Sequence, residues 1–99
     1  MDWVRRLASG AWLVLAMVGS AHADCVPMAQ MRDLIGTGEV IPLLSAVRAA
    51  RGATPGEMID GRLCHAGHGY QYVVTFLAAD GRVIRVLVDA QTGSVAGVR

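Results

Sequence analysis

The sequence predicts an α+β domain in which one main amphipathic helix packs on a three- to four-stranded antiparallel sheet, preceded by a short N-terminal helix. Two observations predict this fold. Apolar residues repeat with a helical period of about 3.6 as far as Arg51, and from Glu57 onward they alternate with a period of two. One amphipathic helix laid across an antiparallel sheet is the simplest arrangement that buries both apolar faces.

Residues 1–23 have the three parts of a secretory signal peptide. Arg5 and Arg6 are followed by an apolar run, and Ala21-His22-Ala23 offers the small-x-small pattern that signal peptidase cleaves. The apolar run of 15 residues is shorter than the roughly 20 that a spanning helix needs. We therefore expect a bacterial protein that is periplasmic or secreted, with no membrane span after cleavage.

Removal of these 23 residues from the 99-residue chain leaves 76, with seven arginines, seven acidic residues and no lysine. A domain without net charge or a basic cluster is a poor candidate for nucleic-acid binding, because neutralised phosphates supply most of that affinity.

Cys25 and Cys64 are the only cysteines. An oxidising compartment favours a disulfide, and a bridge closing a loop of about 40 residues would contribute roughly 4 kcal/mol in the chain-entropy model. Two free thiols or a link between chains are the alternatives.

Two helices are expected before the sheet. Residues 24–37 form an N-terminal segment whose Met28, Met31 and Ile35 have helical spacing. A clearer amphipathic pattern follows, and its apolar face consists of Leu43, Ala46, Val47 and Ala50.

Strands are expected over residues 57–64, 70–77 and 82–89, with a short final strand or tail at 94–98. In the first strand we place Ile59 and Leu63 on one side, with Gly61 weakening the strand or marking a bulge. In the third strand Ile84, Val86 and Val88 should face the helix. The opposite, outer side is unusually apolar for a solvated surface, which makes it a candidate partner-binding surface; its predicted residues are Val73, Leu77, Val83, Arg85 and Leu87.

Two turns frame the third strand. Asp80-Gly81 predicts a tight hairpin reversal, because both residue types tolerate positive φ. After the strand, Asp89 can accept hydrogen bonds from the next backbone N–H groups, and Gly93 can take the left-handed conformation.

The loop CHAGH holds the only cluster of possible metal ligands. His65 and His68 are weak candidates, because a structural zinc site needs four ligands and a disulfide would remove Cys64. We expect no metal and no cofactor. We also expect no enzymatic activity, because neither Ser45 nor Ser94 lies in a nucleophile motif.

Several motifs together resemble the PepSY domain family. They are GEVIPLLSAVRAA, TPGE, YQYVVTFL, the DG turn and VDAQTGSV, which cover residues 38–98. The resemblance implies a PepSY-like domain over residues 38–99, with a helix on a curved antiparallel sheet and no catalytic residues to carry over. The family occurs in peptidase propeptides and as free-standing envelope proteins, and a role in inhibiting peptidases has been proposed for it.

The resemblance predicts an exported, non-catalytic protein-binding module that inhibits or modulates a peptidase or an envelope sensor protein. The alternative is a metal- or redox-responsive envelope protein that uses Cys25, Cys64, His65 and His68.

Overall fold

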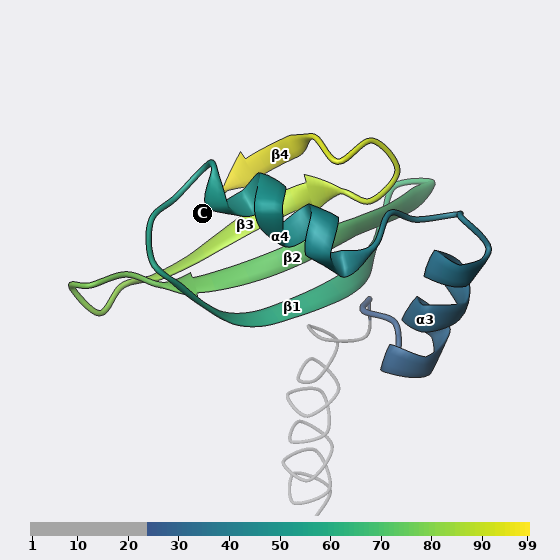
Figure 1. The fold of residues 1–99 in the computed structure, drawn as a ribbon, viewed down its shortest axis with the longest axis horizontal. Helices are drawn as coiled ribbons and strands as arrows, with labels where there is room; N and C mark the ends of the chain where they lie inside the picture. The colour runs from purple at the N-terminus through teal and green to yellow at the C-terminus, as the bar shows by residue number, and fades with distance from the viewer. Residues whose placement is uncertain (1–23) are drawn as a thin grey trace, which may run out of the picture.

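Four antiparallel strands form one sheet, with a helix lying across one of its faces (Figure 1). The computed structural model describes residues 24–99, so the predicted signal peptide at 1–23 lies outside the described residues. The elements in chain order are α3 (Met28–Gly36), α4 (Leu43–Arg51), β1 (Glu57–Ala66), β2 (Gly69–Leu77), β3 (Val83–Asp89) and β4 (Val95–Val98). The strands neighbour one another in that order, which confirms the predicted α+β fold.

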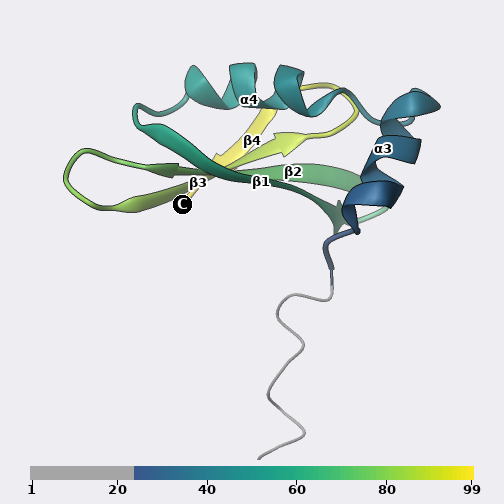
Figure 2. The same ribbon diagram turned by 60° about the horizontal axis from the view of Figure 1, so that its bottom comes forward.

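Helix α4 covers the inner face of the sheet, whereas α3 lies at one end of it (Figure 2). Pro42 precedes α4 with φ −60° and ψ 147°, which suits the entry to a helix. Ala46 and Ala50 are fully buried and Val47 is nearly so. Because alanine side chains are small, this face of α4 can approach β2 and β3 closely.

The core lies between α4 and the inner face of the sheet. Its largest fully buried side chains are Leu63, Tyr72, Val74, Phe76, Val86 and Val88. They come from alternate positions of β1, β2 and β3, because successive side chains of a strand point to opposite faces. Met31 is the one buried residue of α3 and joins the same cluster.

A bulge in β1 makes the predicted side of Ile59 wrong, whereas Leu63 does lie on the side opposite to Asp60 and Arg62. Met58 pairs with Phe76 and Asp60 pairs with Thr75, so Ile59 is an extra residue with no partner on β2. Beyond an extra residue the strand changes its phase. Leu63 is therefore buried, whereas Ile59 is 53% exposed.

Gly61 lies after the bulge and on the side of α4. A Cβ atom on Gly61 would lie 3.1 Å from Met58 Cε and 3.2 Å from Leu43 Cδ1. The missing side chain thus leaves room for two larger apolar ones. Gly61 serves packing against the helix, and the bulge itself lies two residues earlier.

The N-terminal segment is bound to the outer edge of β1. Cys25 and Cys64 form a disulfide, which confirms the predicted intramolecular bridge. On either side of it, the Val26 N–H donates to the Leu63 carbonyl at 2.8 Å and the His65 N–H donates to the Asp24 carbonyl at 2.7 Å. Pro27 then precedes α3, and the chain leaves the sheet.

The tight reversal predicted at Asp80-Gly81 joins β2 to β3, but only Gly81 of the two takes positive φ. The Ala78 N–H donates to the Arg82 carbonyl at 2.9 Å, and Gly81 alone in this loop has positive φ, 90°. This is a three-residue loop closed by a left-handed glycine. Asp80 instead accepts hydrogen bonds from the Arg82 N–H and from Arg82 Nε, and these bonds hold the pKa of Asp80 below its ordinary value.

The β3–β4 turn uses Asp89 as its acceptor. The Oδ1 atom of Asp89 accepts from the N–H groups of Gln91 and Thr92 at 2.8 and 2.9 Å, and Gly93 has φ 79°. Because both bonds favour the ionised carboxylate, the pKa of Asp89 is lowered.

Candidate interaction surface

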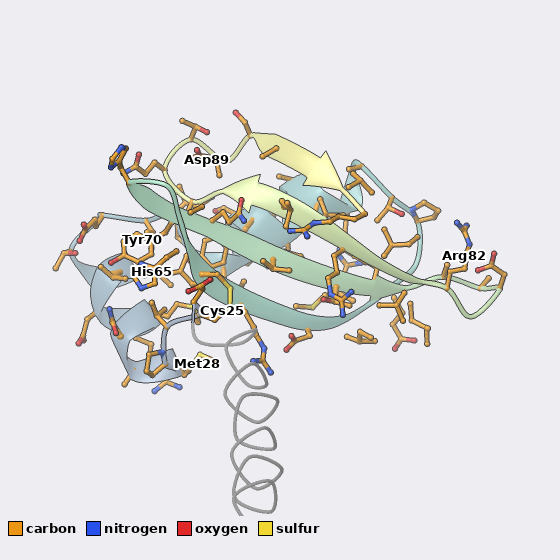
Figure 3. All side chains as sticks on the ribbon, turned by 180° about the vertical axis from the view of Figure 1, so that it is seen from behind. Cys25, Met28, His65, Tyr70, Arg82 and Asp89 are labelled. Atoms are coloured by element: carbon orange, nitrogen blue, oxygen red, sulfur yellow. A yellow bond between two sulfur atoms is a disulfide. The ribbon has the colours of Figure 1, made fainter. Side chains whose placement is uncertain are left out.

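Figure 3 shows the face of the sheet turned away from α4, here called the outer face. The strand register places the predicted partner-binding residues on it. Val73 pairs with Leu87, and Leu77 pairs with Val83. Arg85 pairs with Thr75 between these two rows. Residues directly opposite in an antiparallel pair project to the same side, so all five predicted residues lie together on this face.

Aliphatic side chains on this face are open to solvent. Leu77 is 39% and Val83 is 49% exposed, and the bulge adds Ile59 at 53%. Val73 and Leu87 are half-buried. The sequence pattern missed Ile59, because only the bulge moves it to this side of the sheet.

A shallow hollow of about 480 Å³ lies on the outer face, over β1, β2 and β3. Its aliphatic lining consists of Ile59, Val73 and Val83, and its polar lining consists of Asp60, Arg62, Thr75 and Arg85. The Cys25–Cys64 disulfide completes the lining. Leu77 and Leu87 lie outside it.

A row of polar residues crosses the hollow. Asp60 on β1, Thr75 on β2 and Arg85 on β3 stand opposite one another in the register. The row continues to Arg99, because Arg85 and Arg99 exchange backbone hydrogen bonds at 2.7 and 2.8 Å. Such a doubly bonded pair places its side chains on one face.

Charge on the outer face is only partly balanced. Arg62 Nε lies 3.1 Å from Asp60 Oδ2, so these two charges offset each other. The other ion pair within residues 24–99 joins Arg82 to Asp80 at the hairpin tip. Arg85 belongs to neither pair, and it is exposed.

Both edges of the sheet are protected against pairing with another strand. Residues 24–26 cover one end of β1, and the bulge at Ile59 interrupts the rest of its edge. On the other side, β4 has four residues and its own irregularity opposite Leu87 and Val88. Short strands and bulges blunt an edge, so the outer face is the better candidate for binding.

The prediction that CHAGH is a loop is wrong, because Cys64, His65 and Ala66 belong to β1 and only Gly67 and His68 form the turn. His65 packs against Tyr70, with ring centroids 5.0 Å apart, and Cys64 is bonded to Cys25. His68 lies in the turn between β1 and β2. Within residues 24–99, no three side chains of His, Cys, Asp or Glu come together as a metal site would require.

Over the same residues, the two helices are too short and too polar to cross a bilayer. Comparison of the chain with protein-family models, with curated proteins and with solved structures gives no match.

Proposed function

We propose that this chain is an exported, non-catalytic protein-binding module of PepSY type, and that its outer face contacts the partner. The observation that carries the proposal is the group of exposed aliphatic side chains Ile59, Leu77 and Val83 on one side of the sheet. The partner class that the resemblance favours is a peptidase or an envelope sensor protein, which the module inhibits or modulates.

The energetic reason lies in the composition of this face. A solvated face of an antiparallel sheet is normally polar, whereas here aliphatic residues dominate two of its cross-strand rows. Each Å² of apolar surface removed from water contributes about 25 cal/mol. Contiguous exposed apolar surface with a polar rim is typical of interaction sites.

Two observations support export. The intramolecular disulfide between Cys25 and Cys64 is of the kind that persists in oxidising compartments. The residues before it also have the charge, apolar run and small-residue pattern of a signal peptide.

The metal- or redox-responsive alternative is the weaker candidate. Its two thiols are bonded to each other, and His65 is engaged with Tyr70. No feature of residues 24–99 favours it over the binding module.

The test is affinity capture from a bacterial envelope extract with matched baits. The baits are the wild-type protein, Leu77→Glu, Val83→Glu and the control Leu44→Glu, whose side chain is 59% exposed on α4. Because a few central side chains carry most of the energy of an interface, we expect either outer-face variant to lower the captured amount about tenfold or more. Leu44→Glu should retain it. A set of captured proteins that is the same for all four baits contradicts the proposal.

A further inference from the structure

The most informative group on the outer face is the hydroxyl of Thr75. The residue is only 7% exposed, and it lines the hollow. Within residues 24–99 its hydroxyl makes no hydrogen bond. Over the same residues, every side-chain nitrogen or oxygen atom that is fully buried does have a hydrogen-bond partner. The Thr75 hydroxyl therefore reaches the surface of the hollow, where a ligand could take the place of water as its partner.

Arg85 is a second donor on the hollow, and it stands directly opposite Thr75 on the neighbouring strand. Its side chain is exposed and carries a positive charge. A carboxylate placed between these two residues could accept a hydrogen bond from each of them.

The ligand must also match the rest of the hollow. Ile59, Val73 and Val83 offer an aliphatic surface next to these donors. Of the two arginines that line the hollow, Arg62 is paired with Asp60, which leaves Arg85 for a ligand. One such arginine is too few for a nucleic acid, whose affinity rises with the number of neutralised phosphates.

We propose that the hollow binds a protein segment in which a carboxylate side chain lies next to an aliphatic one. The carboxylate accepts hydrogen bonds from the Arg85 guanidinium and the Thr75 hydroxyl, while the aliphatic side chain packs on Ile59, Val73 and Val83. This inference rests on the proposed function and specifies the chemistry of the partner.

The experiment selects binders from a displayed library of random 12-residue peptides, with the purified protein as bait. Dissociation constants of the selected peptides are then measured for the wild type and for Arg85→Glu, Thr75→Val, Val83→Glu and Arg51→Glu. Arg51 is an exposed arginine at the end of α4 and is the matched charge control.

The selected peptides should be enriched in Asp or Glu beside an aliphatic residue. Arg85→Glu should weaken their binding about tenfold or more, because hydrogen bonds to charged groups are the strong ones. A peptide with Lys in place of its acidic residue should regain affinity for Arg85→Glu. Arg51→Glu should change nothing.

Thr75→Val separates binding from folding. Valine has nearly the shape of threonine and suits a strand, so the thermal midpoint should stay the same or rise when the unpartnered hydroxyl is removed. Peptide binding should nevertheless weaken, by roughly threefold to tenfold, because one hydrogen bond is lost.

Two other outcomes overturn the inference in distinguishable ways. Peptides that Val83→Glu weakens but Arg85→Glu and Thr75→Val leave unchanged would keep the outer face as a binding surface and refute the carboxylate. A selection that enriches no peptide, or only peptides indifferent to all three outer-face variants, would refute the proposed function as well.

Discussion

Replacing Tyr72 with phenylalanine tests how the segment before α4 is held on the sheet. Tyr72 is fully buried, and its hydroxyl donates to the Ile41 carbonyl at 2.6 Å. The Ile41 N–H in turn donates to the Ala90 carbonyl at 2.7 Å. Both backbone groups of Ile41 are therefore bonded to the sheet, and Tyr72→Phe removes one of these two bonds without changing the ring.

The expected cost follows from the carbonyl that loses its partner. A buried acceptor left unsatisfied costs about 1–3 kcal/mol, so Tyr72→Phe should lower the free energy of unfolding by that amount. For a domain of this size, each kcal/mol shifts the thermal midpoint by roughly 4–8 °C. The midpoint of Tyr72→Phe should thus fall by at least about 4 °C.

The same hydroxyl predicts a dependence on alkaline pH. Burial raises the pKa of Tyr72 above its ordinary value of 10.0, because the folded state disfavours the phenolate. The contribution of the neutral phenol is fully present below that ordinary value and is lost as pH rises through the raised pKa. The wild type should therefore lose stability more steeply than Tyr72→Phe above about pH 10.

Urea unfolding followed by circular dichroism measures both effects, with Tyr70→Phe as the control. Tyr70 is half-buried against His65, and its hydroxyl makes no hydrogen bond within the described residues. Tyr70→Phe should keep most of the stability and the alkaline profile of the wild type. If Tyr72→Phe were as stable as the wild type, or had the same alkaline profile, the hydrogen bond to Ile41 would contribute nothing to folding.

Three further predictions concern the disulfide and the turns. Replacing Cys25 and Cys64 with serine opens a loop with a sequence separation of 39 residues, and urea unfolding should show a loss of about 4 kcal/mol. Gly56→Ala should lower the free energy of unfolding by about 2 kcal/mol or more, because Gly56 has φ 128° and a Cβ there would lie 2.8 Å from a backbone oxygen of β2. Gly67 also has positive φ but open space around it, so Gly67→Ala should lower the free energy of unfolding by only about 1 kcal/mol. Two backbone N–H groups lower the pKa of Asp89 below its ordinary value of 3.8, so the stability that the ionised carboxylate contributes is present above that value and is lost on acidification. The free energy of unfolding of Asp89→Asn should therefore fall less than that of the wild type between about pH 5 and about pH 2.

Local patterns were sufficient to predict the elements and most of the faces. The i, i+3, i+4, i+7 spacing of Leu43, Ala46, Val47 and Ala50 placed one side of α4 against the sheet. Strict alternation in β2 and β3 separated the buried row from the outer one. These predictions hold because the period of a helix or a strand is a property of the backbone, and burial follows from it directly.

Contacts between distant residues decided what the pattern could not. The bulge at Ile59 is a feature of the pairing between β1 and β2, and it moves an aliphatic side chain to the outer face. The row of Thr75 and Arg85, and the pairing of residues 24–26 with β1, likewise require the register between strands. A sequence fixes which residue types alternate, but register and edge pairing are set by the free energy of contacts across the whole fold. Only the tertiary structure therefore placed together, in one hollow, a hydroxyl and an arginine that have no side-chain partner among residues 24–99.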